Sequence, residues 1–230
     1  MTKQNCHREL ESSPKMCDIL VNMLSYRKER IDNALLFFAQ NHYTKTRKYL
    51  SQTFLYKYLA FFEFRYLKNV GDMPLELTYR AMDHGPVPIE IYENRANPGY
   101  FTKVIFESFP MKGGQTGYLV KPNGKFDSDY FAGAELEVMN NLIEIFAQSW
   151  VSSAEMSEAS HQDIKAWKKT YSRHPNTDID PIEEFDRDIL AIPEEALHTE
   201  ELKYLMRRKM LDNSQKDIYR YLRDAGFKVV

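Results

Sequence analysis

Two histidines carry the side chains that acid–base catalysis would need. His84 follows Asp83 directly, and His161 lies two residues before Asp163 and six before Trp167. An imidazole titrates near neutral pH, so either ring could move a proton if a carboxylate oriented it. Neither histidine forms a recognised nucleophile motif with a serine or cysteine. We therefore favour a structural interpretation, in which His84 caps or edges the core and His161 fixes a junction between helices.

The segment "HGPVPIEIY", residues 84–92, poses a choice between a phosphate loop and a structural bend. A phosphate loop needs several backbone N–H groups that converge at the start of a helix. This segment has one glycine, Gly85, and two prolines, Pro86 and Pro88, whose nitrogens carry no hydrogen. The pattern favours a hinge, because Gly85 can adopt backbone angles closed to other residues and a proline suits the first turn of a helix.

Metal ligation is disfavoured by spacing. A pair of ligands on one helix needs a second donor at a spacing such as three or four positions. Asp163 lies two positions from His161 and would point elsewhere on a helix. The remaining histidines are scattered along the chain. The sequence therefore predicts no metal, no cofactor and no catalytic residue.

Helical periodicity precedes these residues. The stretch "ERIDNALLFFAQ" places Ile31 and Phe38 on one apolar face, together with residues between them. The next stretch, "TRKYLSQTFLYKYLAFFEFRYLKNVG", is apolar nearly all the way round, which is typical of a central helix with neighbours on several sides. Gly71 and Pro74 are expected to end it.

The hydrophobic period changes after residue 100. The stretches "YFTKVIFESF" and "TGYLV" are rich in β-branched and aromatic residues and are bounded by glycine-containing turns. Helical spacing resumes in "AELEVMNNLIEIFAQSW", and Ser152 with Glu155 then forms a capping box for another helix. The predicted fold is mainly α (α+β): a compact helical domain with a small antiparallel β-hairpin or sheet insertion around residues 100–126.

The composition restricts the class of partner. A formal net charge of −2 excludes a uniformly basic nucleic-acid binder. Fifteen tyrosines and fourteen phenylalanines supply rings for an interaction face as well as a core. The first residues are polar, and no uncharged apolar span approaches the ~20 residues that cross a bilayer. We expect a cytoplasmic protein without a membrane partner, whose cysteines, Cys6 and Cys17, are free thiols.

Charge is segregated along the chain. Residues 45–68 carry six basic side chains and one acid, whereas residues 176–188 carry six acids and one base. These two runs can be solvated edges, can pack against each other, or can receive a partner. As partner contacts, the acidic run offers Glu183, Glu184 and Asp186.

Taken in order, these segments resemble one family. "ERIDNALLFFAQ" followed by "FLYKYLAFFEFRYLKNVGDMPLELTYRAMDHGPVPIEIYENR" is similar to the opening half of the Panacea domain, also called the SocA-like antitoxin or phage-associated GepA-like domain. "LEVMNNLIEIFAQSWVSSAEMSEASH" is similar to its second half, and the resemblance covers roughly residues 28–171. Ala60 departs from the pattern, because the family more often has an aromatic residue there. The positions that match its signature are Lys57, Gly85, Pro86, Val87, His161 and Trp167.

The resemblance implies three regions and a binding function. Residues 1–27 would be an N-terminal extension, residues 28–173 the Panacea-like antitoxin domain, and residues 174–230 an acidic linker with a C-terminal helical extension. The protein would bind and neutralise a cognate toxin, usually encoded by a neighbouring gene, or act as an adaptor that presents the toxin to protease machinery. The family has no established catalytic residues. Whether the chain forms a homodimer stays open.

Surface tyrosines are the aromatic candidates for the partner contact, and we expect Tyr92, Tyr100 and Tyr118 in that role. A different class of function stays open: an uncharacterised phage-associated enzyme, or a nucleic-acid-associated protein. The enzyme alternative requires His84, His161 and an acidic side chain to converge in one pocket. The nucleic-acid alternative requires the basic helix 45–68 to form a continuous basic face, and the sequence disfavours it.

Overall fold

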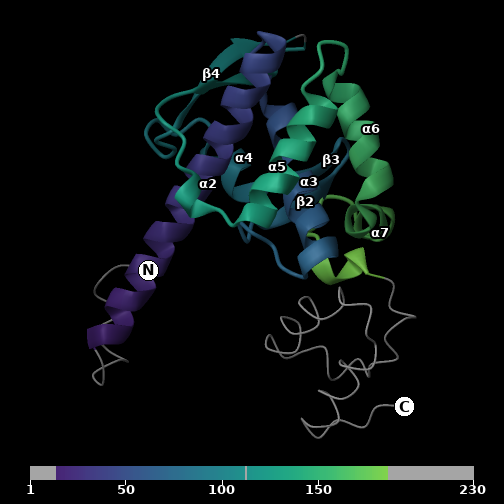
Figure 1. Ribbon diagram of the computed structural model, residues 1–230. Coiled ribbons are helices and arrows are strands. Elements are labelled where there is room, and N and C mark those ends of the chain that lie inside the picture. Colours follow the sequence, from purple (N-terminus) through teal and green to yellow (C-terminus); the bar gives the residue numbers. More distant parts are fainter. Residues whose placement is uncertain (1–13, 112, 186–230) are drawn as a thin grey trace, which may run out of the picture.

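The structure is mainly helical with a small β insertion, as the sequence predicts. The computed structural model describes residues 14–111 and 113–185. Figure 1 shows these residues as helices gathered around one central helix, with the longest strands along one side. They form six α-helices, a three-stranded sheet and a two-stranded sheet. No helix among them has the length and apolar character needed to cross a bilayer.

The central helix is α3 (Gln52–Val70), and both of its ends are capped. Ser51 begins it, because its Oγ accepts a hydrogen bond from the Phe54 N–H at 3.2 Å. Gly71 ends it in the left-handed conformation and donates its N–H to Leu67 O at 2.9 Å. The predicted end of this helix at Gly71 is therefore confirmed.

Burial explains why α3 is apolar on nearly every side. Thirteen of its nineteen residues are buried. α2 (Pro14–Thr46), α5 (Gly133–Phe146) and α6 (Ser153–Asp163) all pack against it. The apolar stripes of the outer helices meet α3, so the hydrophobic core is a layer around one helix.

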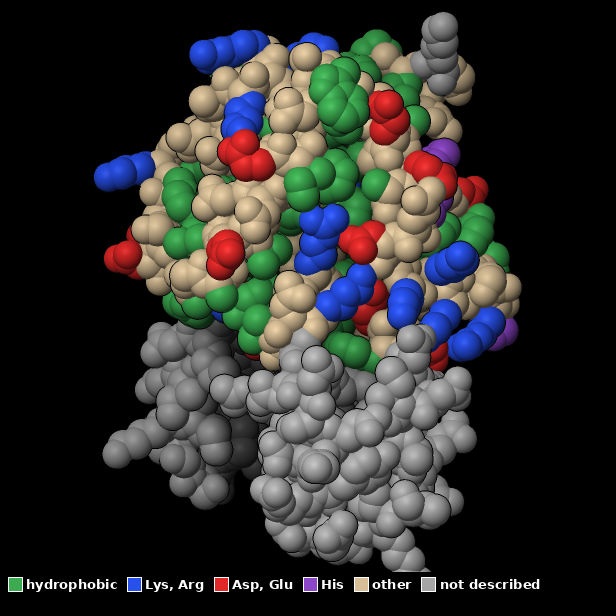
Figure 2. Space-filling view, turned by 45° about the vertical axis from the view of Figure 1, so that its right-hand side comes forward, with side chains coloured by type: hydrophobic (Ala, Val, Ile, Leu, Met, Phe, Trp, Pro, Cys, Tyr) green, Lys and Arg blue, Asp and Glu red, His purple; other side chains and the backbone are tan. Residues whose placement is uncertain are grey.

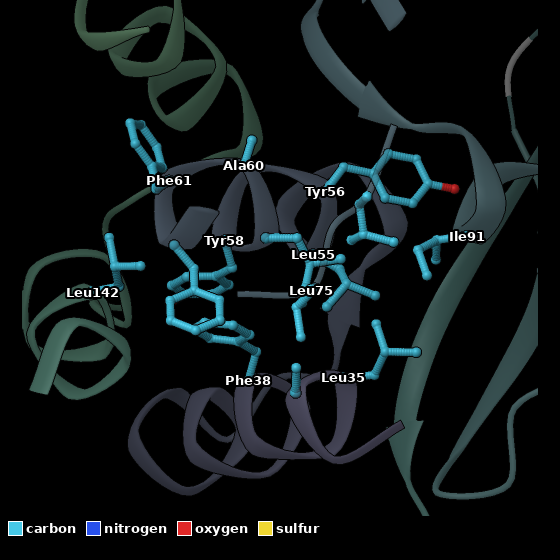
Figure 3. Close-up of a cluster of buried hydrophobic side chains, with 14 of the residues drawn as sticks. Leu35, Phe38, Leu55, Tyr56, Tyr58, Ala60, Phe61, Leu75, Ile91 and Leu142 are labelled. Atoms are coloured by element: carbon cyan, nitrogen blue, oxygen red, sulfur yellow. The ribbon is translucent and has the colours of Figure 1, made fainter. Parts of the chain in front are cut away.

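Stacked rings fix how α3 packs. Tyr58 of α3 stacks on Phe38 of α2 with ring centroids 4.9 Å apart, and Phe61 stacks on Phe146 of α5 at the same separation. Figure 3 shows Phe38 and Tyr58 face to face on one side of α3, with Ala60 on another. Ala60 is fully buried. The small side chain at this position therefore opens no pocket at the surface.

The predicted β insertion is a hairpin of β4 (Val104–Pro110) and β5 (Thr116–Pro122). A third strand, β1 (Leu50–Ser51), pairs with the other edge of β5 at Leu119 and Val120. The strand order is β1-β5-β4, and all pairs are antiparallel. The hairpin is confirmed, whereas β1 occupies residues that the sequence pattern assigned to the central helix.

The segment around Gly85 differs from the prediction. Gly85–Pro88 forms strand β3, which pairs antiparallel with β2 (Tyr79–Met82). α4 (Ile89–Asn94) begins only after Pro88. Prolines are tolerated in an edge strand, where the missing N–H removes no ladder hydrogen bond. Of the two prolines expected at a helix start, Pro88 is the N-cap of α4, whereas Pro86 lies within β3.

The chain continues into the same core after α7 (Lys165–Arg173). It returns to β2, where the Ala81 N–H donates to Thr177 O at 2.8 Å. A 3₁₀ turn, η2 (Pro181–Glu184), follows and packs against α7 and α3. The boundary expected at residue 173 therefore does not separate residues 174–185 from the domain.

Glu63 is a carboxyl group buried completely within the core on α3. Its Oε1 accepts hydrogen bonds from the N–H groups of Leu75 and Leu77 at 2.9 and 3.3 Å, which holds the chain that leaves α3. Burial raises the pKa of Glu63 from 4.5 to about 7, although these hydrogen bonds act in the opposite direction. The folded protein therefore favours the protonated carboxyl.

We expect Glu63→Gln to change the pH dependence of stability. Because the folded state binds this proton more tightly than the unfolded chain, the natural protein should lose stability as pH rises from 4.5 to about 7. The loss should be on the order of 3 kcal/mol, and the neutral glutamine should remove it. Urea unfolding of both proteins at several pH values measures this difference. Parallel curves of unfolding free energy against pH would contradict the prediction.

Candidate functional site

Three segments meet at the backbone of Gly85. The ammonium group of Lys57 on α3 donates to Pro86 O at 3.1 Å and is 1% exposed. A Cβ added at Gly85 would lie 2.6 Å from Lys57 Nζ and 2.6 Å from Ser160 Oγ of α6. Gly85 also has a φ of +98°, which residues with a side chain rarely adopt. Position 85 therefore requires glycine for space and for backbone angle.

Lys57 is held without a counter-ion. Burial lowers its pKa from 10.5 to about 7. Within residues 14–111 and 113–185, no carboxylate lies at ion-pair distance from its Nζ, and Pro86 O is its one hydrogen-bond acceptor. The amine thus ties α3 to β3 by a single hydrogen bond in an apolar setting.

A stack of three rings joins α6 to α7 beside this junction. The rings of His161 and Trp167 lie 4.0 Å apart at 7°, and Trp167 stacks on Tyr171 at 5.0 Å. Trp167 Nε1 donates to Met82 O at 3.1 Å, and Tyr171 Oη donates to Asp83 Oδ1 at 2.9 Å. His161 of α6 therefore stacks on Trp167 of α7 across the junction between the two helices.

The positions predicted from the family signature thus fall in one region. The lysine hydrogen bond, the glycine–proline strand and the histidine–tryptophan stack adjoin one another where α3, β3, α6 and α7 meet. The members of this junction are Lys57, Gly85, Pro86, Val87, His161 and Trp167, and Val87 is a buried residue of β3.

A groove of about 840 Å³ opens beside the junction. Its walls are the start of α3, the turn between β2 and β3, the end of α4, the hairpin and α6. The volume lies within the range of about 300–1,000 Å³ that is typical of binding pockets. The lining residues that carry polar or aromatic groups of interest are Gln52, His84, Tyr92, Arg95, Tyr118, Glu158 and His161.

An arginine lies against two tyrosines in this groove. The guanidinium carbon of Arg95 is 3.8 Å from the centroid of the Tyr92 ring and 5.2 Å from that of Tyr118. Tyr56 approaches Tyr92 at 6.5 Å. No carboxylate lies at ion-pair distance from Arg95 in the described part of the chain. Two of the three predicted contact tyrosines, Tyr92 and Tyr118, are therefore brought together.

Polar groups without hydrogen-bond partners gather around the same groove. Nine buried side-chain nitrogen or oxygen atoms of the described residues make no hydrogen bond of regular geometry, although one of them, Glu184 Oε1, lies 3.0 Å from Lys68 Nζ. Four of the nine belong to side chains that line the groove or lie behind it. Native proteins leave few buried polar atoms unpaired, so a concentration of them needs an explanation. The four atoms are Gln52 Oε1, Tyr56 Oη, Arg95 Nε and His161 Nε2. Figure 3 shows the Tyr56 hydroxyl pointing away from the apolar cluster.

The enzyme alternative requires His84, His161 and an acidic side chain in one pocket, and the fold brings such residues to the same groove. His84 is exposed and His161 is half-buried, and both line the groove together with Glu158. His161 Nδ1 lies 3.7 Å from Glu158 Oε2, which is beyond hydrogen-bond distance. Burial and the nearby charge of Lys57 lower the pKa of His161, so its ring is neutral at pH 7. No group of three or more His, Cys, Asp or Glu side chains in the described ranges is placed to hold a metal ion.

The other predicted partner contacts lie elsewhere. Tyr100 donates to Glu90 at 3.2 Å and is half-buried, outside the groove. Glu183 and Glu184 are buried, and Asp186 lies outside the described residues. Their burial shows that the first two carboxylates serve the fold and are not exposed for a partner.

The basic helix does not form a continuous basic face. Lys45, Arg65 and Lys68 each lie within ion-pair distance of an acid, and Lys57 is buried. Lys68 is 3.0 Å from Glu184, so the acidic segment does pack against the basic helix. Figure 2 shows one face of the molecule, on which several Lys and Arg side chains gather at the lower right and the others are interspersed with Asp, Glu and hydrophobic side chains. The condition set for the nucleic-acid alternative is therefore not met by residues 45–68.

Sequence reasoning missed two residues of this region. Arg95 has no charged neighbour in a motif, and only the fold brings it against Tyr92 and Tyr118. Trp150 is 73% exposed and lies three residues before Ser153, which lines the groove. The signal for Trp150 was available, because it lies two residues before the capping residue Ser152 and therefore outside the helix that Ser152 begins.

We expect Gly85→Ala to destabilise the fold more than the same change at Gly124. Both glycines have positive φ, +98° and +116°, but a Cβ at Gly124 has nothing within 4 Å. Gly124→Ala should cost about 1–2 kcal/mol from backbone strain, whereas Gly85→Ala should cost roughly 2–4 kcal/mol because it also displaces Lys57. Chemical denaturation of both variants measures the difference, and equal losses would mean that position 85 needs only its backbone angle.

Comparison with family models bears on the identity of this domain. Residues 55–168 match the model described as the antitoxin SocA-like, Panacea domain. That segment contains all six residues of the junction and most of the groove. No curated protein and no solved structure gives a significant match. Through residues 55–168, which are about half of its length, the chain belongs to the family of SocA-like antitoxins with a Panacea domain.

Proposed function

We propose that this protein is an antitoxin-like binding module that neutralises a cognate toxin by complex formation, with the groove as the binding surface. Membership of the family supports an antitoxin-like role and implies a toxin partner in general. The observation that carries the choice of surface is the gathering of unpaired polar atoms around a groove lined by tyrosines. A protein partner could supply the missing hydrogen bonds and cover the rings at once.

The groove has the composition of a protein-recognition site. Tyrosine and arginine are the residue types that dominate binding energy at protein interfaces, together with tryptophan. Tyr92 and Arg95 come from the segment after β3, and Tyr118 comes from the hairpin. Trp150 adds a large exposed apolar side chain close to Ser153. A toxin bound here would have part of its surface occluded without any chemical step by this chain.

Two routes to neutralisation follow from the same complex. The bound antitoxin can cover the active surface of the toxin, or it can act as an adaptor that delivers the toxin to a protease in the cytoplasm. Growth rescue in cells that express both proteins tests either route. The amount of toxin during rescue separates them, because occlusion leaves the toxin level unchanged and delivery lowers it.

Acid–base catalysis is the second candidate, because His84 and His161 share the groove with Glu158. The doubly substituted His84→Ala, His161→Ala protein distinguishes the two functions. If the protein is a binding module, rescue by this variant should fall only as far as its affinity for the toxin falls, provided that unfolding measurements show that losing the His161–Trp167 stack leaves the chain folded. Loss of rescue by a folded double variant that still binds the toxin would favour catalysis.

We expect Tyr92→Ala and Tyr118→Ala each to weaken toxin binding by about tenfold to a hundredfold, because they remove rings from the centre of the proposed contact. Tyr100→Ala is the matched control, since it removes a tyrosine that packs outside the groove. Titration calorimetry with the product of the adjacent gene measures the affinities, and growth rescue should fall in parallel. An equal effect of all three substitutions would argue against the groove as the binding surface.

A further inference from the structure

One edge of the β-sheet is open inside the groove. β5 pairs with β4 from end to end, but it pairs with β1 only at Leu119 and Val120. β1 stops at Ser51, because the chain turns into α3 there. Among the described residues, no strand lies beside the remaining edge of β5, at residues 116–118, and no further backbone hydrogen bond is made there.

This open edge faces the groove. Thr116 and Tyr118 line one wall, and Gln52 and Thr53, the first residues after β1, line the adjoining end. The opposite wall is α6, through Ser157 and its neighbours. A chain segment in the groove would therefore continue the line of β1 between β5 and α6.

The open edge of β5 favours an occupant in an extended conformation. A sheet edge carries a row of unpaired N–H and C=O groups, which an added strand satisfies. A helix in the same position would leave those groups unpaired, since its own backbone is already hydrogen-bonded internally. Three residues of β5 span roughly 10 Å, so the edge fits a short extended stretch.

The charges that line the groove favour an occupant with an acidic side chain. Arg95 lies beside Tyr118 on this wall, with its Nε unpaired and no carboxylate at ion-pair distance in the described part of the chain. Glu158 is the one acid that lines the groove in the described residues, and it lies on α6 near His161. An acidic side chain complements this wall.

We propose that the toxin binds through an extended acidic segment that adds as a strand to β5 at residues 116–118 and sets a carboxylate on Arg95. This inference rests on the proposed function and specifies the chemistry of the partner. The guanidinium lies over Tyr92 and beside Tyr118, and one of its terminal nitrogens donates to Tyr92 O. Its other terminal nitrogen is left to donate to a carboxylate of the partner.

The outer edge of β4 is the competing site for an added strand. It is longer, but it ends in Pro110 and carries the exposed Glu107, which pairs with Lys121 across the hairpin. Charged residues and proline are typical protections of an edge against pairing. The open part of β5 lacks both protections and borders the groove, so we assign the partner to β5.

Amide hydrogen exchange of the full chain, alone and with the product of the adjacent gene, tests the strand. Successive N–H groups of a strand point to opposite edges, and Gly117 faces its partner Phe109 on β4. The proposal therefore expects exchange at Thr116 and Tyr118 to slow by about tenfold or more in the complex, as for amides that enter a ladder. Exchange at residues 104–110 should change little. Protection at β4 alone, or at neither strand, would overturn the proposal while the complex itself still supports the proposed function.

Arg95→Ala tests the carboxylate contact. It should lower affinity for the same probe by about tenfold or more, whereas Lys121→Ala, which removes an equal charge from the hairpin at a position outside the groove, should not. If Arg95→Ala loosens the fold, Arg95→Lys keeps the charge but loses the planar stack and should still weaken binding. Unchanged affinity of both arginine variants would overturn the carboxylate contact.

A charge reversal identifies the partner residue. Each Asp and Glu of the protected toxin segment is changed to Lys and combined with Arg95→Glu, and one pair should restore the affinity that each single change lowers. Absence of any restoring pair would overturn the contact. Failure of the adjacent gene product to bind at all would overturn the proposed function, and this inference with it.

Discussion

The hydrogen bond from the buried Lys57 amine to the Pro86 carbonyl is the contact on which the arrangement of this site depends. It joins the central helix to β3 at 3.1 Å, in a slot that exists because Gly85 has no side chain. Trp167 Nε1 donates to Met82 O at the end of β2. His84, in the turn between β2 and β3, lies at the edge of the groove. Widening this slot by one methyl group would shift α3, β3 and α6 relative to one another, because a closely packed interior transmits such strain.

The core carries two ionisable groups whose effects on stability have opposite pH dependence. The pKa of Glu63 is raised by burial, so its contribution is lost as pH rises from 4.5 to about 7. The pKa of Lys57 is lowered by burial, so stability is lost as pH falls from 10.5 to about 7. At neutral pH both groups therefore act against folding, and the stacked aromatic core around α3 must offset them. Both groups hold neighbouring segments in place. Glu63 accepts from the chain that follows α3, and Lys57 donates to β3.

The groove combines features that are costly in an isolated chain and useful in a complex. Four buried polar atoms without partners surround it, and one edge of β5 is unpaired beside it. Rings of Tyr92 and Tyr118 hold Arg95 in a fixed orientation, so little side-chain entropy remains to be lost on binding. Glu183 and Glu184 of the acidic run are buried and do not line this groove, and Glu184 accepts from the Ala166 N–H and lies against Lys68.

Local sequence determined the elements that depend on neighbouring residues. The central helix with its end at Gly71, the capping box of Ser152 and Glu155, and the hairpin within residues 100–126 all follow from short-range patterns. Tertiary structure alone decided that "GPVP" is a strand, because its partner Tyr79–Met82 and the slot at Gly85 come from outside that segment. It also decided which tyrosines share a groove: Tyr92 and Tyr118 meet through Arg95, whereas Tyr100 turns to Glu90. The sequence determined which side chains are available, and packing between distant segments determined which of them face one another, because no periodicity encodes a contact between residues far apart in the chain.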